Sequence, residues 1–369
     1  MGCKMQKLFS RRNFLFSIAL AGLIAFTFCS DGFAQLQGLQ KAAAAKTKAK
    51  ANLFQIDGVA AAGISADQNN NAIIKVYTDK RGVAGVPANL DGVPVTVEFV
   101  GKIFAWDRGG KKGGGGGGSL PTDRYERPVP IGVSAGTTTL SYCFAGTLGC
   151  RLKEVDVSNG NVVGRYMLSN NHVFAEENSG LPGIDQIIQP GTLDNGCVLD
   201  SNDVVGTLFD FVRINFIGQS NLVDAAIATT TTAECGTATP STGWGNPTST
   251  SVAASIGQVV QKYGRTTGLT EGTVDSINVS VNVGYDAGTA AFDDQIVIRG
   301  RVRRGNGYRA SSFSDSGDSG SLIVDQSNNP VGLLFAGNST VTIANPIDTV
   351  LDQFSNAQDG TMMFVDDGN

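Results

Sequence analysis

From residue 126 to the C-terminus, short apolar runs alternate with clusters of Gly, Asn, Thr and Asp, and no helical period is visible until the last turns. Apolar runs bounded by turn-forming residues predict strands, and many of them at this spacing predict an all-β barrel or sandwich. The 48 glycines, against only 11 prolines, fit a chain with many turns. Residues 347–354 predict one closing helix.

The first 34 residues have the layout of a signal peptide. Basic residues occupy the start, and residues 14–28 are apolar, apart from Ser17 and Thr27, but short for a bilayer span. The small residues Gly32 and Ala34 predict cleavage before Gln35. Residues 10–15, Ser-Arg-Arg-Asn-Phe-Leu, resemble a twin-arginine signal. We therefore expect an exported protein, periplasmic or extracellular, without a stable membrane anchor. A permanent N-terminal anchor is the alternative.

A small α+β module and a linker precede the β-rich body. In the module, residues 35–104, the composition of 36–50 predicts a helix. Two apolar runs around an Asn-rich turn at 67–71 predict a hairpin, and alternation at 94–100 predicts a third strand. Residues 105–125 contain an unbroken glycine run, which predicts a flexible linker. No candidate catalytic residue lies before this linker, so we expect the domain from about residue 124 onward to be active once folded, without the module.

Three polar residues of the body have the types and the order needed for nucleophilic catalysis. His172 is the only histidine of the chain and follows an apolar run at a polar turn, where a base can be held on a fixed scaffold. Asp224 enters an apolar run, and a buried carboxylate needs a partner. Ser319 lies on a tight Gly-Asp-Ser-Gly turn. The order His, Asp, Ser, with separations of 52 and 95 residues, is that of the chymotrypsin-type triad.

On these residues, the segment from about residue 128 onward resembles trypsin-like (chymotrypsin-fold) serine peptidases of an exported bacterial branch. The matching motifs are Leu-Ser-Asn-Asn-His at 168–172, Asp-Ala-Ala-Ile-Ala at 224–228, Gly-Asp-Ser-Gly at 317–320 and Gly-Arg-Thr-Thr-Gly at 264–268. The resemblance implies an all-β double β-barrel preceded by the small α+β module. It also implies a serine endopeptidase that cleaves protein or peptide substrates through an acyl-enzyme.

The resemblance implies a role for each of these residues. His172 takes the hydroxyl proton of Ser319 and later gives it to the leaving amine, while Asp224 holds the imidazole. The backbone N–H groups of Gly317 and Ser319 form the oxyanion hole. In many members of the family, the acid that precedes the nucleophile pairs with a new N-terminus made by cleavage. That acid is Asp318 here, but no activating cleavage site precedes Ile131. We therefore expect Asp318 to have another partner.

Three further residues are expected to contact substrate. The strand that contains Phe335 and leads into Gly337 resembles the one that pairs with an extended substrate through main-chain hydrogen bonds. Phe313, six residues before Ser319, stands where the family often places a specificity residue. It favours small or apolar substrate side chains, and the neighbouring Asp315 keeps a basic preference open.

Four cysteines remain after the signal peptide. An even number in an exported chain predicts two disulfides. Three pairings are open, and we favour Cys143–Cys150 with Cys197–Cys235 because each closes a local loop.

Composition narrows the function further. A net charge of −5 argues against a general nucleic-acid binder, and a single histidine excludes a multi-histidine metal site. The triad chemistry requires no metal and no organic cofactor. The basic run at 299–309 either selects acidic substrates or is a solvated strand face, and we favour the solvated face. Two other functions stay open: an inactive peptide-binding barrel, and an esterase with the same triad.

Overall fold

The computed structural model describes residues 30–105, 120–138, 143–356 and 358–368. Most of the signal peptide and the glycine run of the linker lie outside these residues. The described part is mostly β-structure in two sheets, and the predicted all-β class is confirmed. Helix α1 (Ser30–Leu53) runs through the predicted cleavage position before Gln35, and cleavage there stays a prediction.

The first barrel is an eight-stranded sheet in the order β20-β8-β9-β12-β11-β10-β6-β7. Only Leu148 and Gly149 separate β7 from β8, so the sheet closes on itself through one extended segment. Apolar side chains such as Met167 fill its interior. The strands are β6 (Ser134–Thr137), β7 (Gly146–Thr147), β8 (Cys150–Asp156), β9 (Val162–Ser169), β10 (Gln186–Ile188), β11 (Val204–Phe211), β12 (Ala226–Thr229) and β20 (Thr361–Val365).

The second barrel is a ring of six strands. The order β15-β19-β18-β17-β13-β14 is closed by pairing between β14 and β15, and β16 extends the edge of β15. Helix α3 (Ile347–Phe354) follows, as predicted, and packs its apolar residues against the first-barrel core. The strands are β13 (Val259–Gly264), β14 (Gly268–Tyr285), β15 (Gly288–Arg304), β16 (Gly307–Ser311), β17 (Leu322–Asp325), β18 (Pro330–Gly337) and β19 (Thr342–Pro346). Short helices in the first barrel are α2 (Asn171–Phe174), η1 (Thr192–Asn195) and η2 (Ser201–Asp203).

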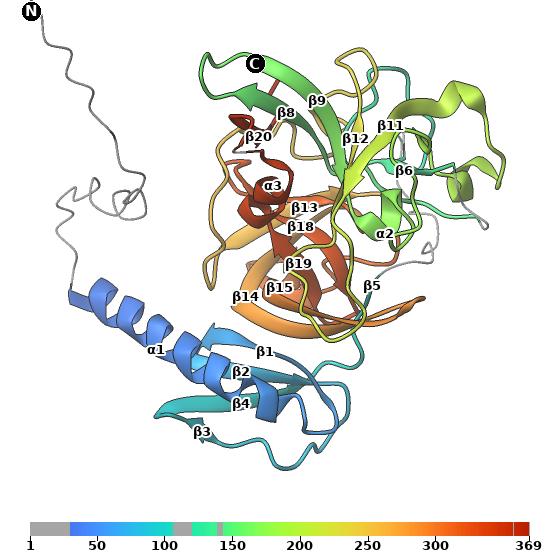
Figure 1. Cartoon of the computed structure of the whole chain (residues 1–369). Helices are drawn as coiled ribbons and strands as arrows, with labels where there is room; N and C mark the ends of the chain where they lie inside the picture. The colour runs from blue at the N-terminus through green and yellow to red at the C-terminus, as the bar shows by residue number, and fades with distance from the viewer. Residues whose placement is uncertain (1–29, 106–119, 139–142, 357, 369) are drawn as a thin grey trace, which may run out of the picture.

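The N-terminal module is a helix lying against a small sheet (Figure 1). Ala42, Ala45, Ala49 and Leu53 recur every three or four residues, so they share one face of α1 and are buried in the module core. The predicted hairpin and third strand are present, the third strand as β4. The strands are β1 (Val59–Ala66), β2 (Ala72–Thr78), β3 (Asn89–Leu90), β4 (Val93–Phe99) and β5 (Phe104–Ala105).

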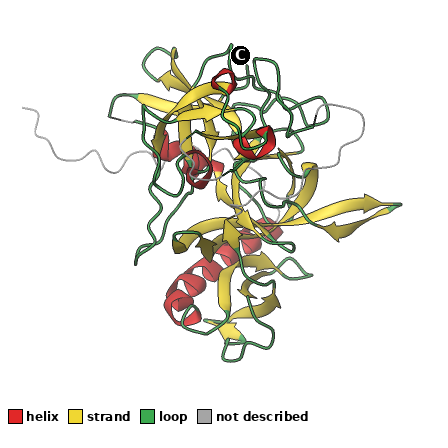
Figure 2. Ribbon diagram, turned by 90° about the vertical axis from the view of Figure 1, so that its right-hand side faces the viewer, coloured by secondary structure: helices red, strands yellow, loops and turns green. Residues whose placement is uncertain are grey.

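The module and the second barrel share one continuous sheet. Strand β1 pairs antiparallel with β14, with Ala61 opposite Val281. Strand β5 pairs with β14 at Gly284 and with β18 at Gly337. Apolar residues of the module and of the second barrel also form a joint core. Figure 2 shows the module below the barrels, with its helix against its strands.

The cysteine pairing predicted from loop length is wrong. The structure pairs Cys143 with Cys197 and leaves Cys150 and Cys235 as buried thiols. The reason is topological: Cys150 begins β8 and belongs to the first-barrel core, whereas the residue after Cys143 hydrogen-bonds to Thr192 of η1, close to Cys197. Burial raises the pKa of the Cys235 thiol to about 12.

A buried lysine contributes to the contact between the module and β14. Lys46 of α1 is 4% exposed, and its Nζ donates to the carbonyl of Asn278 at 2.5 Å and to Ser280 Oγ at 3.3 Å. Burial, the largest cause, lowers the pKa of Lys46 from 10.5 to about 8. Between these values the unfolded chain binds more protons than the folded chain, so the lysine makes stability rise with pH.

We predict that Lys46→Met removes this pH dependence. The stability of the unmodified chain relative to the variant should rise by about 3 kcal/mol between about pH 8 and 10.5, at 1.36 kcal/mol per pKa unit. Chemical denaturation of both proteins at several pH values measures it. Other titrating groups are present in both proteins, so their contributions cancel in the difference between the two free energies of unfolding. A difference that is independent of pH would contradict the prediction.

Candidate active site

His172 is held where the first barrel meets α2. Strand β9 ends at Ser169, and α2 places His172 in a buried position. Its Nδ1 lies 2.5 Å from Asp224 Oδ2, and its backbone N–H donates to Asp224 Oδ1 at 3.2 Å. The carboxylate therefore contacts both the ring and the backbone of the histidine, which fixes the ring orientation.

Sheet register brings Asp224 to His172. Strands β9 and β12 pair with Ser169 opposite Ala226, so the residues just beyond each strand end lie side by side. Asp224 is fully buried. Its backbone N–H donates to Asn345 Oδ1 at 3.1 Å, and its carbonyl accepts from Asn170 Nδ2 at 2.8 Å. These contacts come from both barrels.

Ser319 lies on the turn that leads into β17. Gly317 and Gly320 have φ values of +93° and +92°, in the left-handed region that favours glycine. A Cβ on Gly320 would lie 2.2 Å from the carbonyl oxygen of Thr147, so only glycine fits there. Ser319 Oγ donates to the carbonyl of Phe335 at 3.4 Å.

Strand β7 brings the serine turn next to the histidine helix. Thr147 N–H donates to the Ser319 carbonyl, and Thr147 Oγ1 donates to the Gly317 carbonyl, both at 2.8 Å. A Cβ on Gly146 would lie 2.6 Å from the side chain of Val173 and 3.3 Å from the Ser319 carbonyl oxygen. The residue after His172 and the backbone of Ser319 thus pack against the same glycine.

Asp318 has the internal partner that the sequence led us to expect. Lys262 Nζ lies 3.3 Å from Asp318 Oδ2, and both side chains are fully buried. Thr266 N–H and Thr267 N–H donate to Asp318 Oδ1, and Asp315 N–H donates to Oδ2. Burial lowers the pKa of Lys262, and the attraction of Asp318 opposes part of that effect.

Arg265 links the serine turn to the first barrel. It forms a buried two-point ion pair with Asp194 of η1, at 2.6 and 2.8 Å. Its backbone N–H also donates to Thr147 Oγ1. The Gly-Arg-Thr-Thr-Gly motif thus supplies the arginine of this ion pair and the two amides that bind Asp318. The resemblance of this motif to the trypsin-like family did not predict any of these contacts.

The predicted substrate residues have different surroundings. Phe313 is 2% exposed and packs in the second-barrel core. Phe335 is buried against Phe292, with ring centroids 4.8 Å apart, and its carbonyl accepts from Ser319 Oγ at 3.4 Å. Gly337 lies opposite Phe104 of β5. The part of β18 next to Ser319 is therefore paired with the module's last strand.

Two polar side chains at the site were not predicted. Tyr285 OH donates to Asp224 Oδ2 at 2.9 Å, and Asn345 accepts from Asp224 N–H. They lie 61 and 121 residues from Asp224. Only the pairing of distant strands brings them together, so no local pattern could have indicated them.

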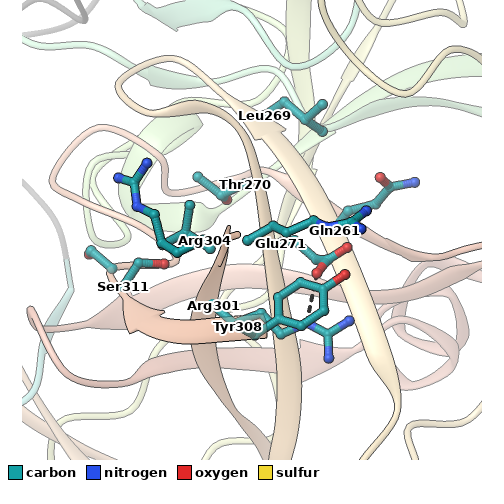
Figure 3. Close-up of a pocket in the computed structure, with 11 residues that line it drawn as sticks. Gln261, Leu269, Thr270, Glu271, Arg301, Arg304, Tyr308 and Ser311 are labelled. Atoms are coloured by element: carbon teal, nitrogen blue, oxygen red, sulfur yellow. Dashed lines mark hydrogen bonds and ion pairs between the residues drawn. The ribbon is translucent and has the colours of Figure 1, made fainter. Parts of the chain in front are cut away.

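The basic run lies beside a hollow on β13–β16 (Figure 3). Arg301 pairs with Glu271 at 2.6 Å, and its guanidinium lies 4.1 Å from the ring centroid of Tyr308. Arg299 pairs with Glu98 of the module at 2.7 Å. The remaining arginines of the run, Arg303, Arg304 and Arg309, are exposed. The run is partly ion-paired and partly a solvated face.

Comparisons with solved structures find similar chains among bacterial proteases. A chymotrypsin of Cellulomonas bogoriensis is 19% identical, with a TM-score of 0.39 over 64% of this chain and 99% of its own. Thermobifida fusca Protease A is 18% identical, with a TM-score of 0.40 over 64% of this chain and all of its own. A Nocardiopsis protease is 18% identical, with a TM-score of 0.40 over 64% and 99%.

No family model and no curated protein matches the sequence. Within the described residues, no helix is both long and apolar enough to cross a membrane.

We predict that Lys262→Met destabilises the protein strongly. Removing one member of a buried ion pair leaves an unpaired charge, which typically costs about 3–5 kcal/mol. Urea denaturation at neutral pH measures the change. Lys80→Met is the matched control, because Lys80 pairs with Asp57 on the exposed surface and its loss should leave the free energy of unfolding unchanged. Equal effects of the two substitutions would contradict the importance of the buried pair.

Proposed function

We propose that this chain is an exported serine endopeptidase. The observation that carries the proposal is the buried contact between His172 Nδ1 and Asp224 Oδ2, with the Ser319 turn packed against the same strand as the histidine helix. A serine hydroxyl is a poor nucleophile at neutral pH and needs a base that a third group orients. His172 and Asp224 are the residues of this site that fit those two roles.

The proposed reaction has two acyl-transfer steps. His172 Nε2 accepts the Ser319 proton while Oγ bonds to the carbonyl carbon of the substrate. The C–N bond then breaks, the amine leaves with the proton from His172, and an ester joins the acyl group to Ser319. In the second step water gives a proton to His172 while its oxygen bonds to the ester carbon. The ester C–O bond then breaks, the acyl group leaves as a carboxylic acid, and the proton returns to Ser319 Oγ. Asp224 stabilises the imidazolium in both steps.

The carbonyl oxygen of the substrate becomes negatively charged in both steps. We propose that the N–H groups of Gly317 and Ser319 bind that oxygen, and removal of one such donor typically costs about 2.7–4 kcal/mol. Two hydrogen bonds support this role. Thr266 Oγ1 donates to the Ser316 carbonyl and Ser321 Oγ donates to the Asp318 carbonyl, both at 2.6 Å, and these carbonyls belong to the peptide units that carry the N–H groups of Gly317 and Ser319.

An extended peptide would bind along β18 beside Ser319. In this structure β5 occupies that edge, with Ala105 opposite Ala336 and Phe104 opposite Gly337. Added strands bind through main-chain hydrogen bonds, so β5 and a substrate would use the same groups. We propose that substrate displaces β5 from β18. Phe313 is buried in the second-barrel core and would influence specificity only indirectly.

The first test concerns the assignment of Ser319 as the nucleophile. We predict that Ser319→Ala abolishes labelling by a fluorophosphonate probe and leaves the circular dichroism spectrum unchanged, because Ser319 carries the hydroxyl that the proposal assigns as nucleophile. Ser327→Ala, on the exposed β17–β18 turn, is the control and should label normally. Undiminished labelling of Ser319→Ala would reject the assignment, and an unlabelled native chain would favour an inactive peptide-binding barrel.

A second arm of the same test separates peptidase from esterase. The native chain is incubated with a peptide library and with a panel of alkyl esters, and the products are identified by mass spectrometry. We expect the native chain to cleave peptide bonds and the Ser319→Ala variant to have lost this activity. Turnover of esters alone would favour the esterase alternative.

The competition between β5 and substrate gives a separate prediction. Ile103 C=O accepts from Gly284 of β14, so by alternation the N–H of Phe104 faces β18. Phe104→Pro removes that donor, worth about 0.5–1.5 kcal/mol, and should lower KM for a peptide about two- to tenfold. Phe104→Ala keeps the N–H and should lower KM less. An unchanged or higher KM in Phe104→Pro would contradict displacement.

A further inference from the structure

Tyr285 brings a hydroxyl from the second barrel to the carboxylate of Asp224. Its OH donates to Asp224 Oδ2 at 2.9 Å, the oxygen that also contacts His172 Nδ1 at 2.5 Å. The Tyr285 ring meets the His172 ring edge-on, with centroids 6.0 Å apart. The tyrosine therefore contacts both the proposed orienting acid and the proposed base.

The tyrosine sits at the tip of the β14–β15 hairpin, where it is held from both barrels. Tyr285 is the last residue of β14, and it pairs with Gly288. Across the tip, the N–H groups of Asp286 and Ala287 donate to the two carboxylate oxygens of Glu177, at 3.0 and 2.8 Å. Glu177 lies just after α2, which carries His172. One carboxylate thus ties the hairpin tip to the histidine segment.

Aromatic packing and strand pairing fix the Tyr285 ring further. Phe216 of the first barrel meets it edge-on at 5.6 Å, and Phe292 of β15 stacks on it at 6.1 Å. The preceding residue, Gly284, donates its N–H to Ile103 of the module at 3.0 Å. A side chain held from three directions can keep its hydroxyl in one place.

We propose that Tyr285 is a positioning residue for the reaction, which fixes the Asp224 carboxylate and through it the His172 imidazole. The inference rests on the proposed peptidase function. A buried carboxylate with a second donor on Oδ2 has one preferred rotation about its Cβ–Cγ bond. Without that donor the carboxylate keeps its contacts with His172, and its rotation, and with it the orientation of the imidazole, is less constrained.

This role makes a kinetic prediction with a matched control. Tyr285→Phe keeps the ring and removes the hydroxyl, and it should lower kcat of the full chain about tenfold with KM unchanged, because a hydrogen bond to a charged group is lost from the reacting unit and not from the substrate site. Tyr166→Phe also removes a phenol that donates to a carboxylate, Glu154 at 3.0 Å, but away from the triad. It should leave both constants unchanged.

The single histidine of the chain allows a direct spectroscopic readout. Full-length protein labelled with ¹⁵N-histidine has one imidazole, so its Nδ1–H signal needs no assignment by mutation. We expect this signal to shift in Tyr285→Phe and to stay in place in Tyr166→Phe. Thermal unfolding of both variants shows that the fold is retained.

An unchanged kcat or an unchanged Nδ1–H signal in Tyr285→Phe overturns the proposal. These outcomes are distinct from a failure of the proposed function. A native chain that neither cleaves peptides nor reacts with fluorophosphonate at Ser319 would reject the peptidase, while the histidine signal would still decide whether Tyr285 acts on the Asp224–His172 pair.

Discussion

A single buried carboxylate organises the centre of this molecule. Asp224 is fully buried, and a carboxylate without water is stable only when donors surround it. His172 supplies a ring contact and a backbone N–H from the first barrel, and Tyr285 supplies a hydroxyl from the second. Asn345 of the second barrel accepts from the Asp224 backbone. Satisfying this one charge therefore requires both barrels to be in place.

Two further buried ion pairs place the serine turn relative to that centre. Lys262 neutralises Asp318 inside the second barrel, and Arg265 reaches Asp194 in the first. Both cations belong to one short segment around the end of β13, so the turn that carries Ser319 is held from within its barrel and across the interface. Buried pairs of this kind are weak sources of net stability but costly to break. We therefore attribute to these ion pairs the positioning of the site and not a large share of the stability of the fold.

Short-range patterns predicted the fold and the candidate site where the relevant information is local. The apolar runs predicted strands, residues 347–354 form the closing helix that was predicted, and the tight turn predicted at Gly-Asp-Ser-Gly is present, with both glycines in the left-handed region. The cysteine pairing, the sheet shared with the module and the role of Tyr285 depend on which distant strands pair, and no local pattern encodes that register. Loop length alone misled the disulfide prediction.

We propose that Ser319, the N–H groups of Gly317 and Ser319, and β18 form one peptide-reacting site. The most direct test is a crystal structure of the full chain after reaction with a peptidyl phosphonate. We expect phosphorus bonded to Ser319 Oγ, a phosphonyl oxygen about 2.7–3.1 Å from the backbone nitrogens of Gly317 and Ser319, and the peptide paired with β18 in place of β5. An adduct on another residue, or a peptide bound away from β18 with β5 still in place, would contradict it.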